Sequence, residues 1–526
     1  MARQGRTHLK TDITTPDGAI GQPGSSAARG SIVLLLSFGA VAGINYAFAI
    51  TMSYLLPVNE YGLLGVMQTI LLLGSTVIGA GFPWALTRVL ATHNRPKEYA
   101  SVFQAALIGN VFTGLLLCGL LILGTWQGWL PFGPQYRIPM LMACATITTL
   151  AVAAVFAAAL QGLLRFGELG LTRLIEVVVK FVAGVIFVLL GWGINGALGA
   201  FLGAALISTL FPALALRNVP IWHIGDEVGT RLRELSRSVG PLFIGQLCLA
   251  ALSNIDIIGL KLFSAADASD LLAGQYQAAI TLTRIPIYLT SALMNAVFPF
   301  ISRHSARTEI ANVYATLALK YLFLFLVPLD LLFLILPDPL IRFFFSKAFD
   351  GSATPMAVAA AGTILLVLVY GLAILLQAAG QLRIQAWALP VTLAVEIVAL
   401  RVLVPRAGTI GAGLALIGGG VCGLIFLLPA TRHTYALHAT LRGTLSYVAA
   451  LATFVALLLI LPQGSRLFTA SAIVVAGGGY LLMLVILGLL TQSDITMLGG
   501  GFGPRVTPRV QRLARLVTWL GFLAPR

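Results

Sequence analysis

The chain has 526 residues, of which 58% are hydrophobic and only 10% charged, with a formal net charge of +15. Its mean hydropathy of +0.95 lies far above that of soluble globular proteins, so that class is excluded. Hydrophobic runs of about 20 residues or more recur from end to end, each long enough to cross a hydrocarbon core of about 30 Å. The composition predicts an all-α polytopic membrane protein.

Hydropathy, divided at Gly, Pro and charged residues, predicts about 14 transmembrane helices. Residues 1–30 precede them and are polar, without an apolar core or a small-residue cleavage site. We therefore expect a disordered cytoplasmic tail and no cleaved signal peptide. The expected spans are 31–56, 62–88, 101–124, 138–162, 170–190, 195–216, 238–262, 272–300, 311–336, 353–378, 385–404, 410–431, 443–462 and 467–491.

The positive charge is distributed unevenly between the two sides of this topology. With the amino terminus inside, inner connectors and tails carry roughly 23 of the 33 Lys and Arg residues, and outer loops roughly five. The positive-inside rule then predicts that both termini are cytoplasmic, in a bacterial-type cytoplasmic membrane. Topology and attraction to anionic membrane lipids explain the net charge, so no nucleic-acid partner is expected.

Residues 492–526 form a basic cytoplasmic tail. Within residues 504–520, Val510, Leu513 and Val517 fall on one helical stripe, and arginines occupy the remainder. This pattern favours an amphipathic helix lying on the inner leaflet, with a disordered basic tail as the alternative.

Residues typical of enzymes and metalloproteins are sparse. The four cysteines fall inside expected spans, so no disulfide is expected, and the six histidines are too scattered for a metal site. No Lys follows a Gly, which excludes a Walker-type phosphate loop. The longest outer loop, residues 337–352, is too short for the large outer domain that membrane glycosyltransferases carry. We therefore expect no cofactor and no enzyme activity.

The first twelve spans contain an internal repeat. Leu160-Gln161-Gly162 ends the fourth span as Leu376-Gln377-Ala378 ends the tenth, and Tyr61 and Tyr276 begin the second and eighth. Parallel repeats of this kind enclose a central cavity between two bundles, although chance similarity of Leu-rich helices is the alternative. The expected units are a six-helix bundle at 31–216, a cytoplasmic linker at 217–237, a second six-helix bundle at 238–431, and two additional transmembrane helices at 443–491.

Ionisable residues inside spans are the candidate functional groups, because an unpaired charge there costs at least about 2.5 kcal/mol. Asp256 and Arg284 lie at comparable depths, which allows them to pair. In one interpretation Arg284 binds a substrate phosphate, and Asp256 adjusts the charge of Arg284 or couples transport to ions. In the other, the ion pair only holds two adjacent helices together. Glu176 and Lys180 are four residues apart, so mutual neutralisation on one helix face is the simpler interpretation.

The remaining polar residues of the spans have two interpretations each. Asn45 and Asn254 are expected either to line a polar cavity or to hydrogen-bond between helices. Charges nearer the ends of spans are expected to reach the membrane interface; these are Lys261, Lys320, Asp330 and Arg401.

A set of motifs in a fixed order resembles one family. The motifs are Tyr61-Gly62-Leu63, Gln161-Gly162, Asn254-Ile255-Asp256, Gly274-Gln275-Tyr276 and Phe298-Pro299. Over about residues 30–490 the chain resembles the polysaccharide-transport, Wzx-type oligosaccharide flippases of the multidrug/oligosaccharidyl-lipid/polysaccharide exporter superfamily. This resemblance implies two six-helix bundles, inward-open and outward-open states, and a polyprenyl-pyrophosphate-linked oligosaccharide as substrate.

The resemblance and the intramembrane polar residues together define the candidate cavity residues. They are Arg284, Asp256, Asn254, Gln275, Tyr276, Lys180, Glu176 and Asn45. Expected partners are the lipid-linked substrate, membrane lipids, and a polysaccharide polymerase or glycosyltransferases. No oligomerisation signature is present, so a monomer is expected.

Three other functions remain open. A cation-coupled multidrug exporter of the same superfamily commonly has an acidic residue in its first helix, where this chain offers only Asn45. A lipid II flippase carries arginines early in its first bundle, whereas the first three spans here hold none before Arg88. A synthesis-complex subunit without transport activity is the third.

Overall fold

The computed structural model describes residues 25–92, 96–128, 130, 132–133, 136–222, 228–238, 241–303, 308–437 and 440–490. Across these ranges the chain is helical and contains no strand, which confirms the all-α class. A helix satisfies every backbone group within its own segment, as the hydrocarbon core of a membrane requires. Most of the expected amino-terminal tail and the whole expected basic helix 504–520 lie outside the described residues.

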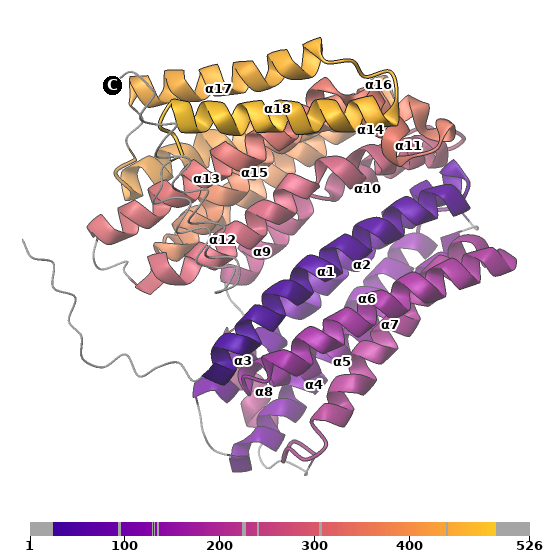
Figure 1. Cartoon of the computed structure of the whole chain (residues 1–526). Helices are drawn as coiled ribbons and strands as arrows, with labels where there is room; N and C mark the ends of the chain where they lie inside the picture. Colours follow the sequence, from indigo (N-terminus) through magenta and orange to yellow (C-terminus); the bar gives the residue numbers. More distant parts are fainter. Residues whose placement is uncertain are drawn as a thin grey trace, which may run out of the picture.

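The helices form two groups that lie side by side (Figure 1). One group contains α1 to α8, and the other contains α9 to α18. The helices of the first group are α1 (Ser25–Leu55), α2 (Val58–Ala80), α3 (Phe82–Thr92), α4 (Pro96–Trp126), α5 (Arg137–Gly162), α6 (Phe166–Phe187), the π-helical turn η2 (Val188–Trp192), α7 (Gly193–Ala215) and α8 (Val228–Ser238).

The second group has more interruptions than the first. Its elements are α9 (Pro241–Leu252), α10 (Ile255–Phe263), α11 (Ser269–Thr283), α12 (Ile285–Arg303), α13 (Thr308–Ile335), α14 (Pro337–Phe344), the 3₁₀ turn η3 (Lys347–Ser352), α15 (Ala353–Ala378), α16 (Leu382–Thr434), α17 (Leu441–Ile460) and α18 (Arg466–Ile486). The assignment of these groups to two repeated bundles, with the boundaries given above, stays a prediction.

The helix count differs from the expected fourteen spans. Within the described ranges, ten helices are long and apolar enough to cross a membrane, or eleven when α9 and α10 count as one bent span. Three features account for the difference. The helix α16 and the continuous segment Phe166–Ala215 each run over two expected spans, and α1 is not counted because its apolar part, Gly39–Leu55, is shorter than a span. In addition, α1 begins at Ser25, so residues 25–30 are helical rather than part of a disordered tail.

Two of these segments fold back on themselves at glycines. The 53 residues of α16 would extend about 80 Å as a straight helix, more than twice the thickness of a hydrocarbon core. Gly408, at φ 52° and ψ −126°, breaks the helix, and a methyl group on Gly419 would lie 3.0 Å from Glu396 in the other half. In the other segment, Gly191 and Gly193 have φ of 87° and 51°. Each segment is therefore a helical hairpin.

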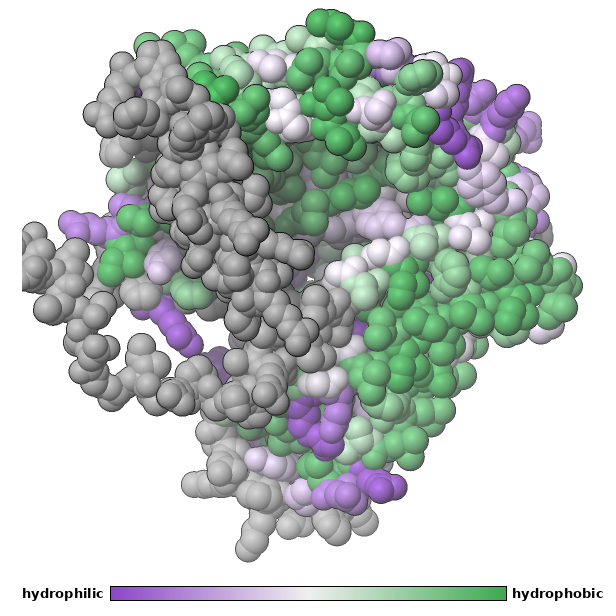
Figure 2. Space-filling view, viewed as in Figure 1, coloured by the Kyte–Doolittle hydropathy of each residue, from purple (hydrophilic) through white to green (hydrophobic). Residues whose placement is uncertain are grey.

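Hydrophobic side chains cover much of the outer surface of both groups (Figure 2). Phe112 is 66% exposed, Leu190 64% and Val474 73%. A surface this apolar is stable against lipid and not against water, which agrees with a multi-pass membrane protein. In the same view the surface is hollowed between the two groups of helices.

Close contact between α2 and α11 joins the two groups at one end. A Cβ added to Gly274 would lie 1.9 Å from the carbonyl oxygen of Val58, and one added to Gly62 would lie 2.3 Å from the Gly274 nitrogen. The Tyr61 hydroxyl lies 3.3 Å from that of Thr281. Glycines allow the two backbones to touch here, as small residues do in membrane helix packing. This end, called the α2–α11 crossing below, is the end expected to face outward.

Candidate functional site

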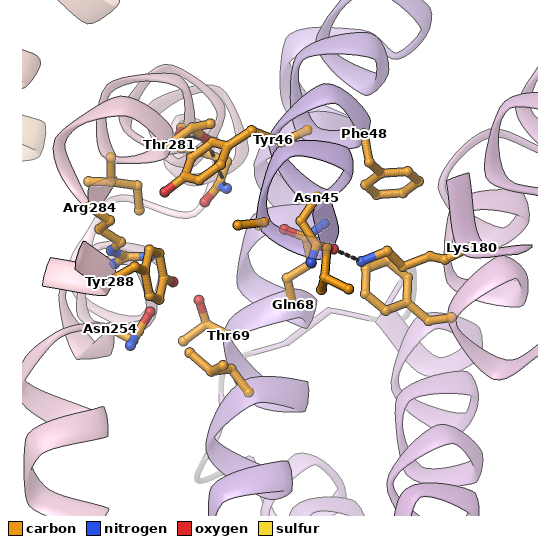
Figure 3. A pocket seen from close by; sticks show the side chains of 18 residues that line it. Asn45, Tyr46, Phe48, Gln68, Thr69, Lys180, Asn254, Thr281, Arg284 and Tyr288 are labelled. Atoms are coloured by element: carbon orange, nitrogen blue, oxygen red, sulfur yellow. Dashed lines mark hydrogen bonds between the residues drawn. The ribbon is translucent and has the colours of Figure 1, made fainter. Parts of the chain in front are cut away.

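A cavity of about 440 Å³ lies beside the α2–α11 crossing, between the two groups of helices. From the first group it takes residues of α1, α2, α6 and α7, and from the second group residues of α11, α12 and the junction of α9 and α10. Its polar lining consists of Asn45, Tyr46, Gln68, Thr69, Lys180, Asn254, Gln277, Thr281, Arg284 and Tyr288 (Figure 3). This volume falls within the range of small-ligand sites.

The second group of helices forms one wall of the cavity, and breaks in these helices bring polar groups to that wall. The helices α9 and α10 meet at a bend of 58°, and Asn254 caps α10 with a non-helical φ of −146°. The Asn254 side chain donates to the carbonyl of Ala250 at 2.9 Å. Arg284 occupies the equivalent break between α11 and α12. Breaks of this kind within a membrane are stable where the backbone lines a cavity.

Arg284 and Asp256 form an ion pair, which their comparable depths allow. The guanidinium Nη2 lies 2.5 Å from Asp256 Oδ1, and the residues are 9% and 1% exposed. Asp256 Oδ1 also accepts the backbone N–H of Ile257 at 2.9 Å, and Oδ2 accepts the hydroxyl of Tyr276 at 2.9 Å. Both carboxylate oxygens are therefore satisfied, and the position of Asp256 in the first turn of α10 is favourable for an anion.

Lys180 belongs to the opposite wall, and its partners are neutral. Its ammonium group donates to Asn45 Oδ1 on α1. The same nitrogen lies 5.3 Å from the ring centre of Phe48 and 4.9 Å from that of Phe201, within the range of cation–π attraction. In Figure 3, Lys180 and Arg284 lie on opposite sides of Asn45.

Four of the eight candidate cavity residues do not line the cavity. Asp256 and Tyr276 are buried and hydrogen-bond to each other, and Glu176 and Gln275 have other partners or positions. Glu176 pairs with Arg173 at 3.1 Å and accepts the Ser208 hydroxyl at 2.5 Å, so the expected neutralisation of Lys180 by Glu176 is wrong. The four-residue spacing permits an ion pair between Glu176 and Lys180. However, Ser208 of α7 and Arg173 bind the Glu176 carboxylate instead. Gln275 lies on the other face of α11, where a methyl group on Gly351 of η3 would come 2.6 Å from its amide nitrogen.

Several lining residues were missed from the sequence. The missed residues Gln277, Thr281 and Tyr288 lie on one helical stripe with the predicted Arg284, since the four follow one another at intervals of four, three and four residues. A polar stripe in an otherwise apolar span is a sequence pattern that could have identified these residues as lining the cavity. The Tyr46 hydroxyl and Gln277 Oε1 are buried without a hydrogen-bond partner among the described residues. Such groups are available to a ligand.

Three other charged residues are buried rather than at the membrane interface. Lys261 is 6% exposed and pairs with Asp270 at 2.6 Å, and Asp330 is fully buried. The expectation that Lys261 and Asp330 reach the membrane interface is therefore wrong. Asp270 of α11 binds Lys261, and packing around α13 encloses Asp330. Glu396 is also fully buried, and no carboxylate oxygen of Asp330 or Glu396 has a hydrogen-bond partner within the described ranges.

Comparison with solved structures identifies the fold. The chain superposes on lipid II flippase MurJ in an inward closed conformation with a TM-score of 0.67 at 16% identity, covering 87% of this chain and 98% of that one. An inward-facing multidrug resistance MATE transporter of the MOP superfamily gives 0.58 at 15% identity, covering 77% and 98%. A MATE transporter from Vibrio cholerae gives 0.53 at 15% identity, covering 78% and 98%. At these identities the likeness establishes the fold alone.

The sequence itself matches one family. No curated protein matches the chain at a significant level. Residues 27–305, more than half of the chain, match the family described as polysaccharide biosynthesis protein. This match agrees with the motif resemblance. The chain therefore belongs to the polysaccharide biosynthesis protein family and has the fold of the MOP superfamily transporters.

Proposed function

We propose that this protein is a flippase that moves a polyprenyl-pyrophosphate-linked oligosaccharide, a surface polysaccharide precursor, from the inner to the outer leaflet by alternating access. The observation that carries the proposal is the cavity between the two helix groups, with a cationic side chain on each wall inside an otherwise apolar protein. The family match supports the link to polysaccharide synthesis. The protein is then a transporter and not an enzyme.

The cavity suits the chemistry of such a substrate. An unpaired diphosphate in a low-dielectric medium is prohibitively unstable, so cationic and hydrogen-bonding groups must replace its water. Lys180 and Arg284 supply charge, while the Tyr46 hydroxyl and Gln277 Oε1 offer unused hydrogen-bonding capacity for sugar hydroxyls. The prenyl chain remains in lipid between the two groups.

The proposal includes the surroundings of the protein. The positive-inside charge distribution supports a cytoplasmic membrane with both termini inside. In that orientation the α2–α11 crossing closes the outer end. We further propose a monomer that works beside a polysaccharide polymerase or glycosyltransferases.

A flipping assay in proteoliposomes tests the function. A fluorescent oligosaccharide linked to polyprenyl pyrophosphate is supplied with wild-type protein or with Arg284→Ala, under a membrane potential or an ion gradient. We expect wild type to flip the lipid and Arg284→Ala to lose most activity while still inserting. Arg284→Lys should recover only part, because a point charge does not reproduce bidentate phosphate contacts. Absence of flipping by wild type under every gradient contradicts the proposal.

The alternatives make different predictions in the same vesicles. A cation-coupled multidrug exporter would drive sodium- or proton-dependent dye efflux, whereas the cationic side chains lining this cavity disfavour cationic drugs. A lipid II flippase would prefer that substrate over other lipid-linked glycans. A synthesis-complex subunit would co-purify with a glycosyltransferase and leave flipping unchanged.

A further inference from the structure

The two cations that line the cavity differ in how their charge is balanced. Arg284 is paired with Asp256 at 2.5 Å, and both residues are buried. The Arg284 side of the cavity therefore carries no surplus positive charge. A neutral ion pair attracts a distant anion weakly, because the two opposite charges largely cancel.

Lys180 forms no direct ion pair among the described residues. Its hydrogen-bond acceptor is the neutral amide oxygen of Asn45, and the aromatic faces of Phe48 and Phe201 attract the ammonium without neutralising it. Glu176, four residues earlier on the same helix, interacts with the Lys180 charge, but it forms its ion pair with Arg173 at 3.1 Å. Two cations and one acid therefore leave surplus positive charge on the Lys180 side of the cavity.

We propose that Lys180 is the residue that first binds the phosphate groups of the substrate, and that it sets the preference for a diphosphate. This inference rests on the proposed function and deepens it. Asn45 and the two phenylalanines hold the ammonium in position, and a phosphate oxygen replaces or joins the Asn45 oxygen as acceptor. Arg284 follows later, because in this state its charge is engaged by Asp256 and freeing it would leave a buried carboxylate unpaired.

Binding of farnesyl diphosphate to the purified full-length protein tests this assignment, with farnesol as the uncharged control. Lys180→Gln should weaken farnesyl diphosphate binding about tenfold or more, the effect of losing one charge-assisted hydrogen bond. Farnesol binding should not change. Lys180→Arg should retain most of the affinity, since the charge is kept.

A control variant separates the local effect from a general loss of charge. Arg401→Gln removes an exposed cation from α16 outside the cavity and should bind as wild type does. Thermal unfolding of each variant shows whether it is folded.

Transport kinetics give a second readout. In the flipping assay Lys180→Gln should raise KM with little change in kcat, and Lys180→Arg should restore KM. Wild-type affinity and KM in Lys180→Gln would overturn the inference, as would an Arg401→Gln variant that loses as much affinity as Lys180→Gln. If wild type binds farnesyl diphosphate through Lys180 but flips no lipid-linked oligosaccharide, the proposed function fails while the binding site stands.

Discussion

Arg284 ends α11 and reaches Asp256, which lies in the first turn of α10, so a buried ion pair of 2.5 Å joins two helices that each interrupt a membrane span. The Tyr276 hydroxyl completes the coordination of the carboxylate. This arrangement makes the two interpretations of the pair experimentally separable. A structural pair is replaceable by neutral groups, whereas a pair that takes part in transport is not.

Removing one member of the pair should destabilise the protein. Asp256→Asn leaves a buried guanidinium without its carboxylate, which typically costs about 3 to 5 kcal/mol of unfolding free energy. The variant should therefore unfold at a clearly lower temperature in detergent. The double variant Asp256→Leu with Arg284→Met should recover much of that stability, because no buried charge remains. If that stable double variant also flips lipid at the wild-type rate, the pair is structural only.

Glycine at the α2–α11 crossing should be required for closure of the end expected to face outward. Gly274→Leu places side-chain atoms where even a Cβ would be 1.9 Å from the Val58 carbonyl, so the helices must separate. Spin labels on the exposed positions Asn59 and Asp267, in a cysteine-free background, should report a longer distance in this variant.

A matched glycine variant provides the control for that experiment. A Cβ on Gly203 of α7 meets nothing within 4 Å, so Gly203→Leu should leave the label distance unchanged. An unchanged distance in Gly274→Leu, in a protein that still folds, would show that the crossing does not control this end of the molecule.

A polar link beside the crossing should contribute to the same closure. Tyr136, which precedes α5, donates its hydroxyl to Asp270 on α11, and Lys261 on α10 binds the same carboxylate at 2.6 Å while lying 4.6 Å from the Tyr136 ring centre. Asp270→Asn should therefore lengthen the distance between the spin labels at positions 59 and 267 and lower the unfolding temperature. Tyr136→Phe removes the hydroxyl only and should have a smaller effect, about 1 kcal/mol. Equal effects of the two variants would contradict a role for the Lys261 charge.

Hydropathy predicted the positions of the helices well because the length and composition of a membrane span are local properties. The similar depths of Asp256 and Arg284 in their spans allowed them to pair but did not establish that they do. The break at Asn254 was missed, since neither Gly nor Pro marks it. The pairing of Lys180 with Glu176 was wrong, because Lys180 binds Asn45 on α1 and Glu176 binds Ser208 on α7. Contacts between helices depend on packing, which the spacing of residues along one helix does not encode.

The attachment of α17 and α18 to α13 gives the last prediction. Pro328 in α13 has no N–H, so the carbonyl of Leu324, four residues earlier, loses its helical donor. The Tyr480 hydroxyl of α18 supplies the missing hydrogen bond at 2.8 Å, and Tyr480 is 4% exposed. We expect Tyr480→Phe to leave that buried carbonyl unpaired and to reduce stability by about 1 to 3 kcal/mol.

Two further variants make this prediction specific to the proline. Tyr447 of α17 donates to the carbonyl of Phe323 at 2.7 Å, but the residue four positions later, Val327, retains its own N–H, so Tyr447→Phe should cost less. In a Pro328→Ala background the new Ala N–H can bind the Leu324 carbonyl, and Tyr480→Phe should then have little effect. Thermal unfolding of the four proteins in this double-mutant cycle measures the coupling. Additive effects of Pro328→Ala and Tyr480→Phe would mean that Tyr480 acts through packing against α13 and not through the carbonyl that the proline leaves free.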